Sequence, residues 1–588
     1  METCQVLTRP GVFQPNLNAL PTEIIDLICE YLWYVHPNSL IALALTSRRC
    51  YGPSVRSFYR EFVVEAITFE NSRFDASMLR FCRTWRLIFR ELENRGDSYE
   101  RLLAAWEPIV EFIARFQHLT DFIYANTSQL PTNLLYALQR HHPKCRLHVR
   151  KRMWALYCPP TDVYELELAK SPCLHSLTVH LLYVGSHRHN DVALRVVNSL
   201  APNLKHVELT FHTFHSKRSR KVFLRDWEDA MQNPKTSKLR ELETLIISEV
   251  KLNRESLETW SQHVDFSKLK SFAFQPSDNG VIYFASKYQF PSLKELYINE
   301  LVSYSPELCA FLAELPPLSC LSIGQRKRGS VEQVLGVILE KHGSHLRTLI
   351  IDISKTCQSE IIAQIGAKCP LLERLDILFT RSQSSYHERR LYEAFGSIRR
   401  LEKLSLTLSN QFDFKESPKI PDPRDESGEY AEFDKQPFPD EPRICNGHVR
   451  DLVLNVAVDR NLILSIWTII RSKQSRRSLR YLRIINYFGG VYEDPEYNLD
   501  GVEGQPLTLT LDLTHMTRSC VLKSTSPTGN RVEFSELPKS RLEIGAEQSI
   551  VPGTGERGLR KIFRRLWPME KGCVNWRARW SSRPLAQD

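Results

Sequence analysis

A short apolar pattern that recurs along most of the chain constrains its fold more than any other feature. The pattern is L-x-x-L-x-L with conservative apolar swaps, and from Leu242 to Leu401 its starts follow one another at steps of 27, 24, 25, 28, 26 and 29 residues. Such a fixed period indicates one supersecondary unit repeated in tandem. The starts are Leu119, Lys144, Leu174, Leu204, Leu242, Leu269, Leu293, Leu318, Leu346, Leu372, Leu401, Val449 and Leu479.

The residues between the copies indicate what each unit contains. A helix-like stretch followed by proline often precedes a copy, as at 361–367 before Pro370 and 308–315 before Pro316. A unit of helix, turn and strand buries its apolar side only against its neighbours, so stacking produces a curved solenoid with parallel strands. The period is that of leucine-rich repeats. We therefore expect an α/β solenoid over 119–410, with terminal repeats at 448–500.

The repeats depart from the leucine-rich consensus at the position where asparagine or cysteine bonds the backbone between turns. Other residues occupy that position in every copy, and four of them carry hydroxyl groups that supply part of the bonding. We expect an irregular solenoid with uneven curvature rather than a smooth horseshoe.

The composition is that of a folded protein, with 42% hydrophobic and 25% charged residues among 588. Lys and Arg total 78 against 68 Asp and Glu, a surplus too thin over this length to indicate nucleic-acid binding. The fourteen cysteines show neither a CxxC pair nor a framework spacing, and no apolar run approaches the roughly 18 residues of a membrane helix. We expect a cytoplasmic or nuclear protein, or one present in both, with reduced thiols and no membrane span.

Residues 15–60 read as three short helices ahead of the repeats. Pro21 suits a first helical position, a break at 36–39 separates the first two helices, and Ser47 is placed to cap a third. A segment this small hardly folds alone without a staple, and no disulfide or metal pattern is present, so a binding partner is the physical expectation.

The same residues resemble the F-box consensus. The match consists of Leu20-Pro21-Thr22-Glu23-Ile24-Ile25, then Ile28, Leu32 and Pro37, then 40–45 and the basic residues after Ser47. Where the family often has a valine-cysteine pair and a later tryptophan, this chain has Leu45-Thr46 and Cys50-Tyr51. The resemblance, to an F-box protein with degenerate leucine-rich repeats of the fungal type, implies binding of a Skp-type adaptor, and through it of a cullin scaffold and a ubiquitin-conjugating enzyme. The expected adaptor contacts are Leu20, Pro21, Ile24, Ile28, Leu32, Leu40 and Leu43.

Three further segments lie outside the repeat pattern. Residues 61–118 read as a helical linker, and 411–447 as an acidic, proline-rich, disordered insertion, so that deletion of 413–442 is expected to be tolerated. Residues 501–588 read as a β-rich cap followed by a basic amphipathic helix. Capping of the solenoid is the favoured role of that helix, and binding to a membrane surface or a partner helix is the alternative.

Motifs of enzymes and metal sites are weak or missing. There is no Gly-x-Ser-x-Gly, His-Glu-x-x-His or phosphate-binding loop. Residues 553–558 fit G-x-G-x-x-G without a βαβ context, and the histidine pairs at 187–189 and 212–215 lack a second ligand pair. The basic run 217–221 is either a solvated loop, which we favour, or an import signal or anion patch. We expect no catalytic residues, no cofactor and no metal.

Strand periodicity indicates where a substrate would bind. The fourth and sixth positions of each copy point into the core, so the third and fifth face outward onto the concave surface. Mixed charges and aromatics on that surface favour a protein partner over nucleic acid. The residues on which we base this expectation are His206, Glu208, Thr244, Ile246, Glu295, Tyr297, Arg374, Asp376, Tyr481 and Arg483.

The sequence thus predicts a non-catalytic substrate receptor of an SCF-type cullin ubiquitin ligase, with the three-helix F-box as adaptor site and the solenoid as substrate site. The alternative is a leucine-rich-repeat scaffold that uses the F-box for assembly without ubiquitin transfer. Joint capture of adaptor and cullin distinguishes the receptor from the scaffold.

Overall fold

The structure is a computed structural model of the whole chain. It describes residues 19–36, 38–58, 61–65, 85–90, 99–116, 119–125, 130–154, 167–183, 201–213, 241–301, 304–325, 332–352, 359–381, 386–409, 430–439, 441–475, 477–487, 518–524, 531–537, 556–568, 580–582 and 585. The chain divides into two compact units, Met1–Val250 with Glu258–Leu269, and Lys251–Leu257 with Lys270–Asp588. Each unit combines strands of a large mixed sheet with helices, an α/β architecture.

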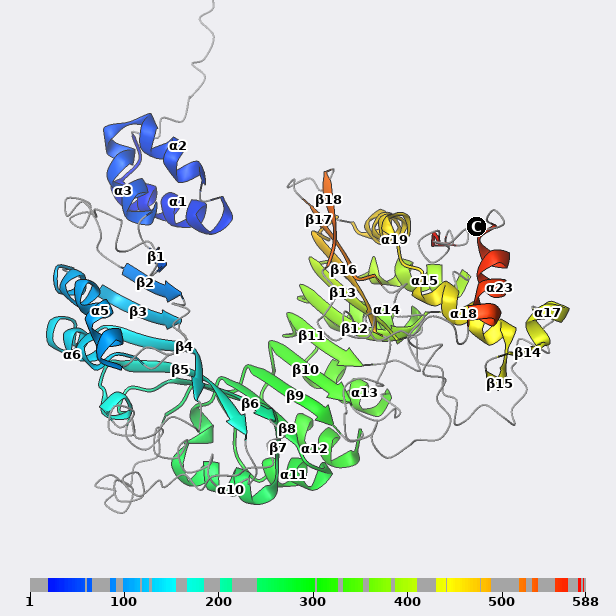
Figure 1. Ribbon diagram of the computed structural model, residues 1–588, viewed down its shortest axis with the longest axis horizontal. Coiled ribbons are helices and arrows are strands. Elements are labelled where there is room, and N and C mark those ends of the chain that lie inside the picture. The colour runs from blue at the N-terminus through cyan, green and yellow to red at the C-terminus, as the bar shows by residue number, and fades with distance from the viewer. Residues whose placement is uncertain are drawn as a thin grey trace, which may run out of the picture. The chain divides into compact units, whose positions relative to one another are not determined.

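The first unit begins with three helices and continues as a parallel sheet in which strands adjacent in sequence are neighbours, from β1 to β7 (Figure 1). Its elements are α1 Thr22–Val35, α2 Asn38–Thr46, α3 Arg48–Phe58, β1 Glu61–Glu65, β2 Trp85–Arg90, α5 Tyr99–Ala114, β3 Leu119–Ala125, α6 Thr132–His141, β4 Arg146–Trp154, β5 Leu174–Tyr183, β6 His206–Thr213 and β7 Thr244–Leu252. At the unit boundary follow α10 Arg254–His263 and the 3-10 helix Phe266–Lys268.

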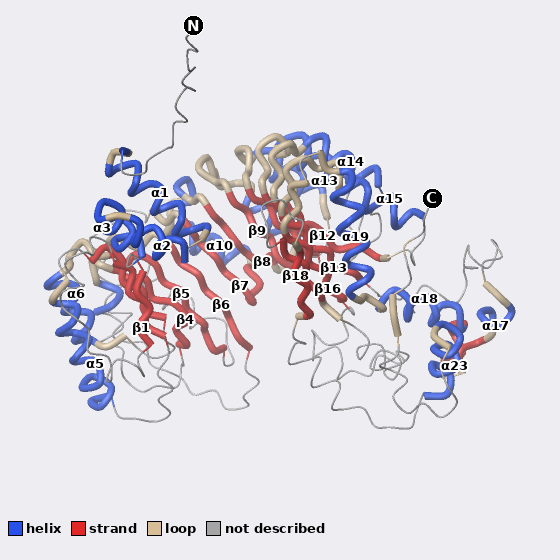
Figure 2. Tube along the Cα trace, turned by 90° about the horizontal axis from the view of Figure 1, so that it is seen from above, coloured by secondary structure: helices blue, strands red, loops and turns tan. Residues whose placement is uncertain are grey.

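The second unit alternates strand and helix up to β13 and then changes. Its first part contains β8 Ser271–Pro276, α11 Asn279–Ala285, β9 Glu295–Leu301, α12 Pro306–Glu314, β10 Cys320–Gln325, α13 Glu332–Lys341, β11 Thr348–Asp352, α14 Ser359–Lys368, β12 Arg374–Thr380, α15 Tyr386–Phe395 and β13 Lys403–Ser409. The helices lie along one face of these parallel strands (Figure 2). In each unit we call the face of the strands that carries the third and fifth positions of the repeat copies the open face, and we extend the name to the same side of β17.

An inserted group of elements separates β13 from its neighbour β16. The group contains α17 Glu432–Lys435, β14 Pro437–Phe438, β15 Glu441–Cys445, α18 Asn446–Val456 and α19 Arg460–Lys473. After it come β16 Tyr481–Tyr487, which pairs parallel with β13, and the antiparallel strands β17 Cys520–Ser524 and β18 Val532–Glu536. The last helix is α23 Glu556–Leu566.

Twelve of the thirteen predicted repeat copies coincide with a strand, from β3 at Leu119 to β13 at Leu401, and β16 at Leu479. The copy at Val449 is the exception, because those residues lie in α18. There Val449, Leu452, Val453 and Val456 are spaced as one stripe of a helix, and all four are buried. Over so few residues the apolar pattern fits both a strand copy of the L-x-x-L-x-L type and one stripe of a helix, so packing decides between strand and helix. Of the terminal repeats predicted at 448–500, the copy at Val449 was therefore wrong, whereas the copy at Leu479 coincides with β16.

The prediction of a helical linker at 61–118 was also incomplete. This segment contributes α5, but it also contributes β1 and β2, which pair parallel with each other and with β3. The sheet therefore begins about two strands before the first L-x-x-L-x-L copy.

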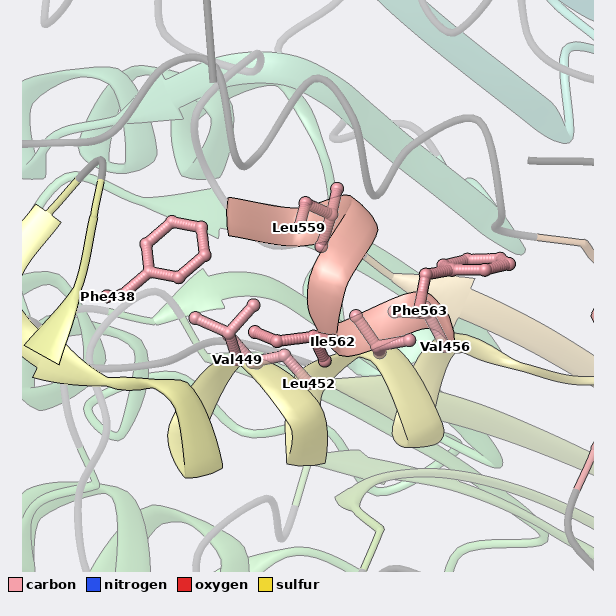
Figure 3. Packing of buried hydrophobic residues seen from close by; sticks show 8 residues of the cluster. Phe438, Val449, Leu452, Val456, Leu559, Ile562 and Phe563 are labelled. Carbon is pink, nitrogen blue, oxygen red and sulfur yellow. The ribbon is translucent and has the colours of Figure 1, made fainter. Parts of the chain in front are cut away.

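The predicted disordered insertion at 411–447 is folded over its final part. Residues 430–447 form α17, β14, β15 and the start of α18, while 410–429 lie outside the described residues. Phe438 is 1% exposed and lies beside Val449 of α18, in one buried cluster with Leu452, Val453 and Val456 (Figure 3). Deletion of 413–442 would remove this side chain, so the expected tolerance of that deletion no longer holds.

Substitution of Phe438 with alanine is expected to destabilise the second unit by about 3–5 kcal/mol, the usual cost of truncating a buried phenylalanine. Urea unfolding followed by tryptophan fluorescence measures the loss, and hydrogen exchange in α18 and α23 locates it. The matched control is Val532→Ala on β18, where the side chain is 37% exposed and the expected change is below about 0.5 kcal/mol. Equal midpoints for the two variants would contradict the assignment of Phe438 to a core.

The basic helix α23 buries its apolar side, but on the inserted group and not on the end of the sheet, where the sequence placed it as a cap. Leu559, Ile562 and Phe563 lie on α18 in the same cluster as Phe438 (Figure 3). Lys561 and Arg564 are exposed. The helix thus covers the inserted group, whereas β16, the last parallel strand, is followed in the sheet by β17 and β18. The turn signal at 528–530, the alternating leucines at 507–513 and Trp576 lie outside the described residues.

Buried side chains just after the repeat helices bond neighbouring repeats together. His342 is 0% exposed; its Nε2 lies 3.0 Å from the carbonyl oxygen of Leu312, and its Nδ1 accepts from the backbone N–H of Leu318 at 3.3 Å. His142 and Gln474 occupy the corresponding place and bond carbonyls of the preceding repeat at 2.9 and 3.2 Å. These side chains form some of the bonds to backbone groups of the neighbouring repeat that an asparagine ladder would supply, but from a different position in the repeat.

The stability of the second unit is expected to fall as pH drops from about 6.5 to about 4. Burial lowers the pKa of His342 from 6.5 to about 4. Between these pH values the His342 ring is therefore protonated in the unfolded chain but neutral in the folded chain. Because of this group, the free energy of unfolding is roughly 3 kcal/mol higher above pH 6.5 than it is at about pH 4. The measurement is the urea midpoint against pH for the wild type and for His342→Gln, whose amide keeps both bonds without titrating. Parallel curves would assign the pH dependence to other groups.

Among the described residues no single helix is long and apolar enough to cross a membrane; α18 and α19, which meet at 71°, pass that test only as a bent pair. The nine described cysteines carry free thiols.

Candidate functional site

The three N-terminal helices form a small core of their own. Ile25 and Cys29 of α1, Leu40 and Leu43 of α2 and Cys50 of α3 are each at most 9% exposed and cluster together. The predicted cap of α3 is present, since the Ser47 hydroxyl oxygen accepts from the backbone N–H of Cys50 at 3.2 Å. These contacts position the outer surface of the three helices.

That outer surface carries several large apolar side chains. Six of the nine large hydrophobic side chains that are exposed in the described part of the chain lie on α1 to α3, so the exposure is concentrated there. On α1 they are spaced at i, i+3 and i+7 and share one face. We call this set the apolar surface; it comprises Ile24 at 41% exposure, Leu27 at 60%, Tyr31 at 66%, Ile41 at 50%, Leu45 at 82% and Tyr51 at 49%.

The residues predicted to contact an adaptor lie in three different environments. Pro21 and Ile24 are exposed, Leu20, Ile28 and Leu32 are half-buried against the small core, and Leu40 and Leu43 are inside it. Leu40 and Leu43 therefore hold the helices together and are not available for direct contact in this arrangement. Leu27, Tyr31, Ile41, Leu45 and Tyr51 were missed, although the i, i+4 spacing of Ile41 and Leu45 was readable beside the Leu40 and Leu43 pair.

The side chains along the repeat strands agree with the predicted strand phase. In β6, β9, β12 and β16 the fourth and sixth positions of the copy are buried, and the third and fifth are half-buried or exposed. The predicted residues divide between the units. The open face of the first unit carries His206, Glu208, Thr244 and Ile246, and that of the second carries Glu295, Tyr297, Arg374, Asp376, Tyr481 and Arg483.

A polar network crosses the open face of the first unit. Arg146 donates to Asp121 at 2.9 Å, and His148 lies between Asp121 at 3.0 Å and the Ser176 hydroxyl at 2.8 Å. Burial alone would raise the pKa of Asp121, but the hydrogen bonds from His148 and Arg146 outweigh it and lower that pKa well below its usual range. Both ring nitrogens of His148 are thereby engaged, so the network rigidifies this face.

Histidines of three neighbouring strands stack beside that network. The ring of His175 is 5.5 Å from that of His148 and 5.3 Å from that of His206, both in edge contacts. Burial, and then the nearby His148 and His206, lower the pKa of His175 to about 4. In the described ranges no group of three or more His, Cys, Asp or Glu is placed to hold a metal ion. The pair at 187–189 and residues 215–221 lie outside those ranges.

The open face of the second unit places two of the predicted pairs close together. Arg374 and Asp376 of β12 form an ion pair at 2.6 Å, and only β13 separates them from Tyr481 and Arg483 of β16. Tyr297 is half-buried, and its hydroxyl accepts from the Cys320 thiol at 3.2 Å. Burial and that neighbour raise the pKa of Tyr297 well above its usual value.

Comparisons with known proteins leave the family open. No family model matches the sequence, and no curated protein matches it. Among solved structures the chain is similar to a crystal structure of the Rad7 and Elc1 complex in yeast, with 13% identity, a TM-score of 0.36, and coverage of 66% of this chain and 88% of that chain. A likeness this loose assigns neither a fold family nor a function.

Proposed function

We propose that this protein is the substrate-recognition subunit of an SCF-type cullin ubiquitin ligase and is itself non-catalytic. In this proposal α1 to α3 form an F-box that binds a Skp-type adaptor, and the strands and helices after them form a leucine-rich-repeat solenoid that binds a protein substrate. Holding the substrate near the charged conjugating enzyme raises its effective concentration, and no chemistry by this chain is needed.

The observation that carries the proposal is the apolar surface of α1 to α3. Side chains such as Leu27 and Leu45, exposed by 60% and 82%, contribute roughly 1.5–3 kcal/mol each when a partner buries them. Large apolar side chains left exposed in this number on three short helices are typical of protein interaction sites. The F-box consensus residues occupy the same three helices, so the sequence resemblance and the exposed surface point to one partner class.

The open face is the proposed substrate site because its side chains are mixed in charge and include aromatics. Tyr and Arg are enriched among residues whose truncation weakens protein complexes most, and both occur on β12 and β16 as Arg374, Tyr481 and Arg483. Charges of both signs occur together there, as in the Arg374–Asp376 ion pair, which favours a polypeptide over a uniform polyanion.

The test is capture of the tagged full-length protein from cells with the proteasome inhibited, followed by identification of bound proteins. The expected result is recovery of a Skp-type adaptor together with a cullin, and ubiquitin transfer to a co-captured protein on addition of ubiquitin, activating enzyme and conjugating enzyme. Recovery of the adaptor without cullin or transfer supports the scaffold alternative. Recovery of neither overturns the F-box assignment.

A further inference from the structure

A group of basic side chains gathers around one tyrosine on the open face of β13, β16 and β17. Tyr481 lies in register between Lys403 of β13 and Lys523 of β17, and neighbouring strands are about 4.8 Å apart. Arg483 is two residues beyond Tyr481 on β16 and so faces the same side. We call Lys403, Arg483 and Lys523 the cation cluster.

The members of the cation cluster differ from other basic residues nearby in lacking a compensating acid. Arg374 is paired with Asp376, and Arg518 with Glu536 at 2.9 Å. Within the described residues no ion pair or hydrogen bond joins a side chain of the cluster to an acid, including Glu533, which lies opposite Lys523 on β18. Like charges gathered on three adjacent strands repel one another, and folding alone gives no reason to gather them.

Arg483 carries a further sign of an incomplete site. Its Nε is shielded from solvent and has no hydrogen-bond partner, and the residue itself is only half-buried. A buried N–H without an acceptor is unfavourable, whereas a guanidinium that meets a carboxylate or phosphoryl group forms strong, charge-assisted bonds. Because the Nε is shielded while the residue is only half-buried, an anion arriving from the open side meets the part of Arg483 that remains exposed, together with the exposed Lys403 and Lys523.

We infer that the cation cluster, with Tyr481, binds a polypeptide segment that carries closely spaced anionic oxygens, either carboxylates of Asp and Glu or phosphoryl groups. The inference rests on the proposed function and specifies the chemistry of its substrate. Arg483 binds the anionic oxygens. Lys403 and Lys523 make the surface on either side of Tyr481 positive, and the Tyr481 ring contacts the peptide between them.

Nucleic acid is the less favoured occupant because acidic groups border the cluster. Asp376 lies one strand beyond Ser405 in the row of Arg483, and Glu533 lies beyond Lys523. A continuous phosphate backbone would pass over these carboxylates, whereas a short anionic segment meets the cations alone.

The test measures binding of short fluorescent peptides to the full-length protein by anisotropy. The probes share one sequence, with the anionic positions occupied by glutamate, phosphoserine or glutamine. The wild type is expected to bind an anionic probe at least about tenfold more tightly than the glutamine probe, with weaker binding at high salt. The tighter of the glutamate and phosphoserine probes identifies the source of the anion.

Two variants address the cluster directly. Combined Lys403→Gln, Arg483→Gln and Lys523→Gln substitution is expected to weaken the anionic probe about tenfold or more, and Lys403→Glu with Lys523→Glu, both at exposed positions, to do the same without touching the half-buried arginine. The matched control removes three exposed charges elsewhere, by Lys368→Gln, Lys561→Gln and Arg564→Gln. Its affinity is expected to stay within about twofold.

Three results would overturn the inference: wild-type affinity in both cluster variants, equal binding of the glutamine probe, or preferential displacement of the probe by single-stranded DNA, which would indicate a nucleic-acid surface. Adaptor capture is measured on the same samples. Loss of peptide binding with adaptor capture intact supports the cluster, whereas peptide binding without any adaptor capture by the wild type refutes the proposed function alone.

Discussion

Combined substitution of Leu27 and Leu45 with aspartate is expected to abolish capture of a Skp-type adaptor and to leave the unfolding of the protein itself unchanged. Both side chains lie on the apolar surface, at 60% and 82% exposure, so charges there cost the free protein little. In a complex each carboxylate would be buried without a partner, which costs several kcal/mol of binding free energy. A micromolar complex has only about 8 kcal/mol of binding free energy, so most of it would be lost.

The controls separate loss of the surface from loss of the fold. Tyr136→Asp with Tyr283→Asp changes two other exposed hydrophobic side chains, at 52% and 54% exposure, and is expected to retain adaptor capture. Leu40→Asp, inside the small core, is expected to lose capture together with the helical order of α1 to α3. Unchanged capture by the Leu27 and Leu45 variant would show that the adaptor binds elsewhere or not at all.

Substitution of Arg381 with methionine is expected to destabilise the second unit by about 3–5 kcal/mol, because it leaves a buried carboxylate without its counter-charge. Arg381 and Glu388 have side chains 1% and 0% exposed and are joined at 2.8 Å, and the hydroxyl of Tyr392 donates to the same carboxylate oxygen at 2.7 Å. Burial opposes the charge on Arg381, but Glu388 and Tyr392 outweigh that effect and raise its pKa.

The same guanidinium also connects distant parts of the chain. It donates to the carbonyl oxygens of Leu454 and Asn455, at 3.3 and 3.0 Å, near the end of α18 and more than 70 residues along the chain. We therefore expect the loss to appear first as faster hydrogen exchange in α18, ahead of the shift in the urea midpoint.

A second variant distinguishes charge from hydrogen bonding in this pair. Arg381→Met combined with Glu388→Gln removes both charges, and the expected result is recovery of part of the stability lost in the single variant. Equal losses in the single and double variants would instead assign the stabilisation to the carbonyl bonds of Arg381. A loss below about 1 kcal/mol in the single variant would refute the role of this pair.

The sequence alone determined the repeating part of the fold. Strand alternation and the 24 to 29 residue period are local properties, and they placed twelve strands correctly from Leu119 to Leu479. The three N-terminal helices and the cap at Ser47 were likewise readable, because caps and i, i+4 stripes depend on neighbours in sequence. The F-box function itself remains a proposal.

Only the tertiary structure decided which apolar side chains are buried and which are displayed. Ile24 and Ile25 are adjacent and equally hydrophobic, yet Ile25 is 1% exposed in a core with Leu40 while Ile24 is 41% exposed. The same limit explains Val449, whose spacing fits a strand but whose packing against α23 makes a helix. The cation cluster also depends on pairing between β13 and β16, about 80 residues apart, because charges become neighbours through strand register rather than through sequence.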